Sequence, residues 1–233
     1  MIIGNRPEEY LEYALASTKW VNEHIIVNTG NDMNPNLAIV KAVLPNAKIL
    51  NFSETGLPFT FSNARNYALQ NSTTDWILWQ DADEVHFDSF KIELMQILDW
   101  IHYDAFEFGF YHFLLDVFHY QSVDARTNIF KRCGTQWYGD VHEQVSGLNN
   151  IYKHPYRYHH YGYTKPQNEI YENWKLYWSL NPSERYKLNE NRNPNDIISD
   201  RVTVARKYVG PYPESIERFV YAQKPKVDNY KFI

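Results

Sequence analysis

The sequence predicts an α/β fold in which a mixed, mainly parallel sheet is flanked by helices and followed by a C-terminal helical tail. The first half of the chain alternates apolar runs of strand length with segments of helical period. One run, residues 75–80, is apolar almost throughout, as expected for a strand covered on both faces. With 233 residues, 44% of them hydrophobic, the chain can form one domain with a full core and a short appendage.

The first half contains four predicted strands separated by three predicted helices. The strands are residues 1–3, 24–28, 48–52 and 75–80, and the helices are residues 6–17, 35–45 and 62–72. In the first helix Pro7 suits the first turn, and Glu8 and Glu9 lie at the positive end of the helix dipole. Ser62 or Asn63 is the expected N-cap of the third helix.

The second half changes character after a further predicted helix at residues 89–101. Strands are expected at residues 105–113, 126–132 and 156–163, with a loop at residues 137–145, and helices at residues 168–180 and 196–209. Residues 181–195, rich in Asn and Pro, are expected to form a loop region between those two helices. The expected division is a main domain over residues 1–165 and a helical extension over residues 166–233. Trp174, Tyr177 and Trp178 should pack the extension on the main domain.

Composition excludes several classes of protein. The net charge of −5 and the absence of a basic run argue against a nucleic acid as the main partner. A single cysteine, Cys133, excludes an internal disulfide, and there is no Cys pair with the spacing of a structural zinc site. The start of the chain lacks the features of a signal peptide, and no apolar run approaches the roughly 18 residues of a membrane helix. These features favour a cytoplasmic protein with at most peripheral membrane contact.

Two carboxylates separated by one residue, Asp81 and Asp83, directly follow the apolar strand at residues 75–80. Such a pair suits a hard divalent cation that also takes phosphate oxygens as ligands. Pairs of this kind also occur in ordinary acidic loops, so the position matters more than the pattern. In open parallel sheets ligands bind beyond the carboxyl ends of strands, which is where this pair is expected.

Five segments in order resemble the motifs of glycosyltransferase family 2, which has the GT-A fold. They are residues 63–69 (NARNYAL), 75–87 (DWILWQDADEVHF), 129–132 (IFKR), 137–145 (WYGDVHEQV) and 159–164 (HHYGYT). The resemblance implies that residues 1–165 form a catalytic domain that binds a nucleotide-diphospho-sugar. It also implies that Asp83, assisted by Asp81, coordinates Mn²⁺ or Mg²⁺. Arg65 would contact the donor near its phosphates or ribose, a role that a planar, permanently charged guanidinium suits; the ordinary alternative is a surface cation on a helix.

The family usually carries an Asp-rich turn after its second strand that reads the nucleotide base, and the corresponding stretch here is residues 27–35. Asn28 stands where the first Asp is expected, and Asp32 matches a later Asp. An amide both donates and accepts hydrogen bonds whereas a carboxylate only accepts. The resemblance therefore implies a base pocket at Asn28 and Asp32 without fixing its preference for uridine.

The loop at residues 137–145 supplies the candidates for acid–base chemistry. An inverting transfer needs a carboxylate that takes the proton of the acceptor hydroxyl as it attacks the sugar. Glu143 is the candidate for this general base and Asp140 is the reserve, with an ordinary polar loop as the alternative. The family often completes its metal shell with a late histidine, which implies His160, while His142 remains an alternative.

The sequence thus predicts a metal-dependent inverting glycosyltransferase acting on an acceptor hydroxyl of a glycan, a lipid-linked sugar or a protein. One alternative is a nucleotidyltransferase of similar fold, which usually needs a Gly-rich loop after the first strand; residues 2–10 hold one Gly and one Arg. The other is a non-catalytic carbohydrate-binding module, which the 17% aromatic residues would permit. A binding module would not explain the paired carboxylates or Glu143.

Overall fold

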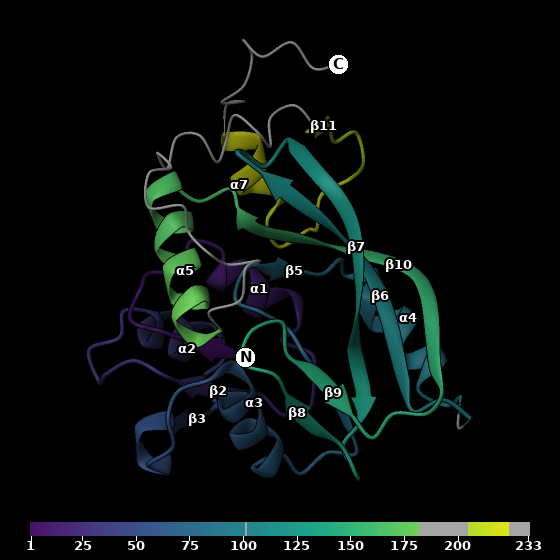
Figure 1. Ribbon diagram of the computed structural model, residues 1–233. Coiled ribbons are helices and arrows are strands. Elements are labelled where there is room, and N and C mark those ends of the chain that lie inside the picture. Colours follow the sequence, from purple (N-terminus) through teal and green to yellow (C-terminus); the bar gives the residue numbers. More distant parts are fainter. Residues whose placement is uncertain (101, 182–204, 224–233) are drawn as a thin grey trace.

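Two sheets form the frame of the protein in the computed structural model, which describes residues 1–100, 102–181 and 205–223. Short strands and helices from the first 80 residues lie on one side of the molecule, and long strands of the later chain lie on the other (Figure 1). The fold is therefore mixed α/β, as expected.

The first sheet is parallel and has the strand order β1–β2–β3. It consists of β1 (Ile2–Ile3), β2 (Ile25–Asn28) and β3 (Lys48–Asn51), and its helices are α1 (Leu11–Ser17), α2 (Asn36–Val43), the 3₁₀ turn η1 (Phe52–Thr55) and α3 (Phe61–Gln70). Because side chains alternate along a strand, neighbouring residues of β2 face different helices. Ile26 packs with Leu11 and Val40 of α1 and α2, whereas Val27 packs with Ala64 of α3. The helices thus cover both faces of this sheet.

The second sheet is larger and mixed, with the order β11–β7–β6–β10–β5 and with β4 paired to β7. Its strands are β4 (Trp76–Leu78), β5 (Glu84–Val85), β6 (Ala105–Leu114), β7 (His119–Lys131), β10 (Ile151–Tyr163) and β11 (Arg206–Lys207). The pair β6–β10 is parallel and the other pairs are antiparallel. Helix α4 (Ser89–Ile97) packs on this sheet through Phe90 and Leu94 against Phe106 and Phe108.

The expectation of a mainly parallel sheet is confirmed for the first sheet only, because the larger second sheet is mixed. The apolar strand β4 is antiparallel to β7, with Trp76 opposite Lys131 and Leu78 opposite Ile129. Its apolar character reflects burial against the rings and aliphatic side chains of the second sheet, not a central position among parallel strands. An apolar run of strand length does not by itself show which strand will pair with it.

Two helices begin at residues other than those predicted. Helix α1 begins at Leu11, so Pro7, Glu8 and Glu9 precede it. Glu8 is instead drawn to the ammonium group of Lys165, a partner far along the chain. Helix α3 is capped by Thr60, whose side chain accepts a hydrogen bond from the backbone N–H of Asn63.

The C-terminal part is not purely helical. Helix α5 (Gln167–Leu180) forms where a helix was expected, and α7 (Glu217–Ala222) packs through Val220 into a cluster with Tyr10 and Tyr161. Of the second predicted tail helix, residues 196–204 lie outside the described residues and Arg206–Lys207 form strand β11. The loop expected at 181–195 also lies outside the described residues from residue 182 onward.

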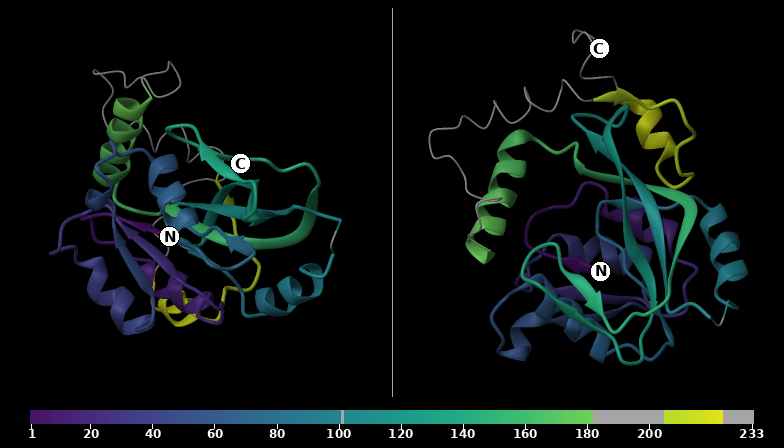
Figure 2. Two further views of the ribbon diagram at one scale, coloured as in Figure 1. Left: turned by 90° about the horizontal axis from the view of Figure 1, so that it is seen from below. Right: turned by 45° about the vertical axis from the view of Figure 1, so that its right-hand side comes forward.

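The inner face of α5 was only partly predicted. The ring of Tyr177 packs edge-on against Phe61 of α3, whereas Trp178 is 37% exposed. Arg6 donates hydrogen bonds to the carbonyl of Glu169 and to the side chain of Asn173, which joins α5 to the start of the chain. The two views of Figure 2 place α5 and α4 at opposite sides of the molecule. The domain boundary at residue 165 stays a prediction.

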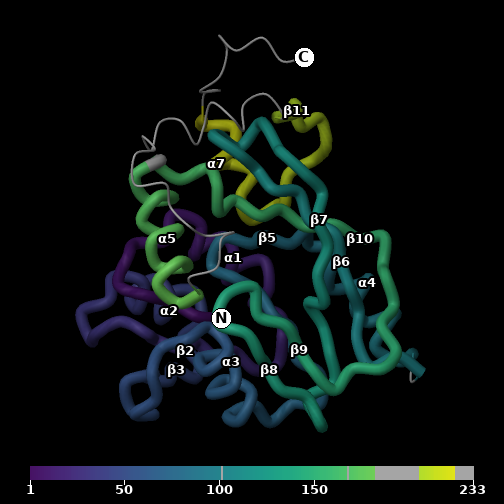
Figure 3. Tube along the Cα trace, in the orientation of Figure 1, coloured from purple at the N-terminus to yellow at the C-terminus, as the bar shows by residue number. Residues whose placement is uncertain are grey.

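A two-stranded hairpin, β8 (Gln136–Tyr138) and β9 (Gln144–Ser146), contains the segment that was expected to be a loop. It lies between α3 and the long strands (Figure 3). Its turn holds Gly139 with φ of 91° and His142 with φ of 56°.

In the part of the chain that the structure covers, no helix combines the length and apolar character needed to cross a bilayer.

Candidate active site

The candidate site lies where four separate segments meet. The segment after β4 supplies Asp81 and Asp83, α3 supplies Arg65, the β8–β9 turn supplies Glu143 and the end of β10 supplies His160. Asn28 and Asn51 stand at the carboxyl ends of β2 and β3. The structure thus brings together most of the residues that the sequence singled out.

Arg65 joins two of the predicted site residues. Its Nη2 donates to Asp81 Oδ1 at 2.9 Å and its Nε donates to a carboxylate oxygen of Glu143. The guanidinium also lies over the ring of Trp79, 4.3 Å from its centroid, and 5.2 Å from that of Trp137. Arg65 is buried, so it is a central member of the site and not a surface cation.

Asp81 is held by two arginines, one of which the sequence analysis missed. Arg126 Nη1 donates to Asp81 Oδ2 at 2.9 Å, so both carboxylate oxygens of Asp81 accept from guanidinium groups. Burial opposes the charge of Asp81, but Arg65 and Arg126 outweigh it and hold the pKa of that carboxyl far below its usual range. Asp81 therefore stays ionised.

Arg126 also binds Glu84, which is fully buried. The Glu84 carboxylate accepts further hydrogen bonds from the backbone N–H of Asp81 at 2.8 Å and from the hydroxyl of Tyr158 at 3.2 Å. The guanidinium of Arg126 lies 3.8 Å from the ring centroid of Trp79. The sequence neighbours of Arg126, Ala125 and Thr127, carry no signal for this role, because the contact depends on the pairing of β4 with β7.

Asp83 faces a different set of partners. A carboxylate oxygen of Asp83 lies 3.5 Å from His160 Nε2, and the other lies 3.5 Å from Lys165 Nζ. The backbone carbonyl of Asp83 accepts from the N–H of Tyr161 at 2.9 Å, which fixes this loop beside β10. Burial lowers the pKa of His160, although Asp83 opposes that shift. Lys165 was the second site residue that the sequence analysis missed.

Gly162 keeps space open between Asp83 and His160. A Cβ atom at residue 162 would lie 2.8 Å from His160 Nε2 and 3.0 Å from Asp83 Oδ2, closer than side-chain carbons normally approach. One nitrogen and one carboxylate oxygen thus border a point that any larger residue would fill. These groups fit a divalent cation that takes few protein ligands and completes its shell with phosphate oxygens and water.

The histidine and acidic side chains do not form a closed metal cage. Within residues 1–100, 102–181 and 205–223 there is no group of three or more His, Cys, Asp or Glu side chains arranged to hold an ion. Asp83 and His160 are adjacent, whereas the oxygens of Asp81 are directed to arginines. The alternative ligand, His142, is exposed on the β8–β9 turn. Asp81 as a metal ligand stays a prediction.

Asn28 is an organiser of the loop that follows β2. Its Oδ1 accepts from the backbone N–H of Gly30 at 3.0 Å and from Asn34 Nδ2 at 2.8 Å, and its Nδ2 donates to Asn51 Oδ1 at 3.2 Å. A carboxylate at position 28 could not donate to Asn51. Asp32 is exposed on the same loop, so both residues predicted for a base pocket lie at this edge of the first sheet.

Glu143 and Asp140 have different surroundings although they share one turn. Glu143 is 8% exposed and is bound to Arg65, whereas Asp140 is exposed. The turn is held to α3 because Asn66 accepts from the backbone N–H of Trp137 and donates to its carbonyl, both at 2.9 Å. Arg65 precedes Asn66 on α3, so this contact also brings Glu143 close to Arg65.

A cavity of about 580 Å³ lies beside the site, between the first sheet and β4. It meets the charged cluster at Arg65, Trp79 and Trp137. Its lining does not include Asp81, Asp83 or Glu143. The charged cluster, and not this cavity, is therefore the candidate active site.

Several solved structures show a distant likeness to this chain. Staphylococcus aureus TarS residues 1–349 align with a TM-score of 0.44 and 13% identity over 84% of this chain and 67% of that one. A second S. aureus TarS structure aligns with a TM-score of 0.46 and 14% identity, over 87% of this chain and 42% of that one. A third structure is that of glucosyl-3-phosphoglycerate synthase from Mycobacterium tuberculosis in complex with phosphoglyceric acid. It aligns with a TM-score of 0.37 and 15% identity, over 47% of this chain and 42% of that one. The chain thus spans under half the length of the synthase. No curated protein sequence matches.

Comparison with protein families gives a match over most of the chain. The profile described as glycosyl transferase family 2 matches residues 1–208, which include all the site residues described above. This match confirms the resemblance that the ordered motifs indicated. The chain belongs to glycosyl transferase family 2.

Proposed function

We propose that the protein is a metal-dependent inverting glycosyltransferase that moves a sugar from a nucleotide-diphospho-sugar to an acceptor hydroxyl. The observation that carries the proposal is the placing of Asp83 and His160 around a space that Gly162 keeps open. The ion pairs of Arg65 with Asp81 and Glu143 also support the proposal, because they hold a cation and a candidate base in one cluster.

Asp83 and His160 would hold Mn²⁺ or Mg²⁺, with Asp81 assisting. When bound, the cation would stabilise the negative charge that develops on the departing diphosphate. Lys165 keeps a second positive charge beside Asp83. Arg65 would contact the donor near its phosphates or ribose while two of its N–H groups keep Asp81 and Glu143 in place.

Glu143 would accept the proton of the acceptor hydroxyl. Its contact with Arg65 fixes the orientation of the carboxylate, and a fixed position beside the reacting groups is what a general base needs. Asp140 is the reserve for this role, since it lies on the same turn but in solvent. The acceptor itself, whether glycan, lipid-linked sugar or protein, is open.

The test is a panel of nucleotide-diphospho-sugars incubated with the protein and Mn²⁺, with release of the nucleoside diphosphate as the readout. Release from one or a few donors, lost on chelation and in Asp83→Asn, is expected. Asp88→Asn, an exposed carboxylate nearby, is the matched control and should retain release. No release from any donor, or full release in chelator, would contradict the proposal.

A further inference from the structure

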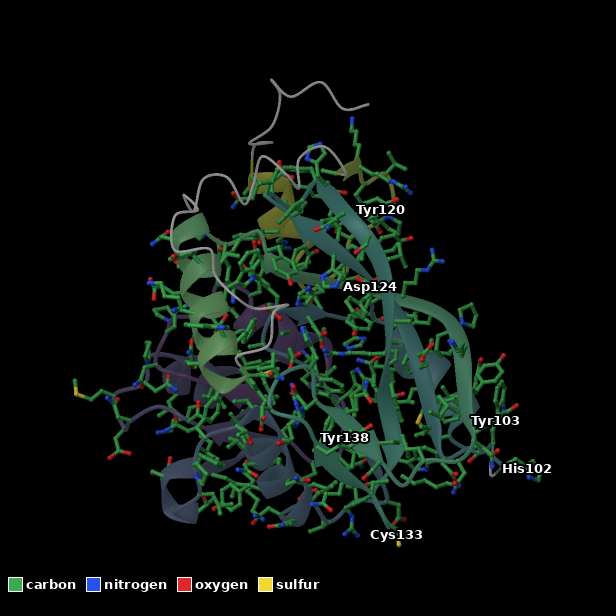
Figure 4. All side chains as sticks on the ribbon, in the orientation of Figure 1. His102, Tyr103, Tyr120, Asp124, Cys133 and Tyr138 are labelled. Carbon is green, nitrogen blue, oxygen red and sulfur yellow. The ribbon has the colours of Figure 1, made fainter. Side chains whose placement is uncertain are left out.

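A line of polar side chains crosses three strands of the second sheet and ends at Asp83. Asp124 lies part-way along β7, below Tyr120 (Figure 4). His112 of β6 pairs in register with His160 of β10, and Asp124 pairs with Phe110, which places Asp124 diagonally opposite His112. The line therefore runs from the surface to the candidate cation site.

The distances along this line are those of hydrogen bonds at its outer end. A carboxylate oxygen of Asp124 lies 3.0 Å from His112 Nε2, and the two Nδ1 atoms of His112 and His160 lie 2.9 Å apart. His160 Nε2 then faces Asp83 at 3.5 Å. The side chain of His112 is 18% exposed and that of Asp124 is 54% exposed.

The proton positions follow from what each group can do. A neutral imidazole has one N–H and one lone pair, and a carboxylate only accepts. A neutral His112 therefore places its proton on Nε2, toward Asp124, and presents the lone pair of Nδ1 to His160. His160 must then donate from Nδ1, which leaves the lone pair of its Nε2 on the side of Asp83.

We propose that His112 is a positioning residue that fixes the tautomer and orientation of His160, so that His160 Nε2 presents a lone pair to the cation site. This inference rests on the proposed function for the role of the cation, but the tautomer itself does not. Partners that bind the second nitrogen of a metal-ligating histidine commonly fix its ring and tautomer in this way. His112 has no place in the predicted motifs, because its role depends on strand register.

The first test needs no metal. In ¹⁵N-labelled full-length protein at about pH 8, where ordinary histidines are neutral, the nitrogen shifts of His160 should show the proton on Nδ1. In His112→Phe, which keeps a ring but cannot accept a hydrogen bond, His160 should become a mixture of tautomers. His112→Asn retains an acceptor near the position of Nδ1 and should restore the wild-type signature.

The second test measures Mn²⁺ binding by the decrease in the EPR signal of free Mn²⁺. His112→Phe should weaken binding by about 10- to 100-fold, and His112→Asn should recover most of it. His160→Ala is the reference for loss of the ligand. A wild-type His160 with its proton on Nε2, or Mn²⁺ affinity unchanged in His112→Phe but lost in His160→Ala, would overturn the proposal. Absence of Mn²⁺ binding in the wild type would refute the proposed function and the metal role of His112, while the tautomer is judged separately.

Discussion

Asn66 pairs with the main chain of Trp137 through both ends of its side-chain amide, in the manner of a neighbouring strand. Arg65 precedes Asn66 on α3, and Glu143 follows Trp137 around the β8–β9 turn. The two ion-paired side chains of the candidate site are therefore brought together by an adjacent, uncharged contact.

Asn66→Ala should consequently impair catalysis without touching a charged group. The two backbone groups of Trp137 would lose their partner, at a cost of about 1–3 kcal/mol in the free energy of unfolding. Turnover should fall because Glu143 is no longer held at Arg65. Thermal unfolding and steady-state kinetics measure the two effects, with Gln70→Ala, exposed on the same helix, as the control. Wild-type kinetics in Asn66→Ala would show that the turn is positioned by other contacts.

Substitution at Glu143 should separate binding from chemistry. Glu143→Gln keeps the shape of the side chain but cannot take a proton, so turnover should fall by roughly 100- to 10,000-fold with little change in donor affinity. The kinetic comparison is with Asp140→Asn, which should be nearly as active as wild type. The reverse pattern would assign the base to Asp140. A product that retains the donor's anomeric configuration would contradict the inverting mechanism.

Gly162→Ala should remove cation binding while the fold persists. The added carbon would enter the space beside His160 and Asp83, at 2.7 Å from His160 Cε1. We expect Mn²⁺ affinity, measured by calorimetry, to fall by at least about 10-fold. Mutating a residue that only hydrogen-bonds to a metal ligand already lowers metal affinity by about that factor. Gly4→Ala, where the new carbon would meet only Thr29 Oγ1 at 3.7 Å, is the control. Equal Mn²⁺ affinity in both variants would place the cation elsewhere.

His86 should make the protein sensitive to acid. It stacks on Phe90, its Nε2 has no hydrogen-bond partner among the described residues, and burial lowers its pKa to about 3. An unfolded histidine has a pKa of about 6.5, so the unfolded state takes up a proton first as the pH falls. Stability is therefore fully present above about pH 6.5 and decreases toward pH 3, by up to about 1.4 kcal/mol per pH unit.

His86→Phe should reduce this loss, so its stability relative to wild type should rise by about 2 kcal/mol between pH 7 and pH 5. Urea unfolding at a series of pH values gives the comparison. His102, which is on the surface (Figure 4), is the matched control, and His102→Gln should leave the dependence on pH unchanged. An unaltered pH dependence in His86→Phe would mean that other groups, such as the equally buried His159, dominate.

The sequence by itself determined many of the elements and the family of the protein. Apolar periodicity is a local property, and it correctly indicated the strands of the first sheet and helices α2, α3, α4 and α5. The order of the motifs indicated the family, and it named Arg65, Asp81, Asp83, Glu143 and His160, whose side chains meet in the fold.

Only the tertiary structure decided which partners those residues have. The antiparallel pairing of β4 with β7 brings Arg126 to Asp81, and the register of β6 with β10 brings His112 to His160. Lys165 reaches Asp83 from the segment between β10 and α5. Strand pairing depends on which edges compete for hydrogen bonds across the whole chain, so contacts between distant segments are not encoded in any local pattern. For that reason the charged residues of the site could be named from the sequence, but the pairs that hold them in place could not.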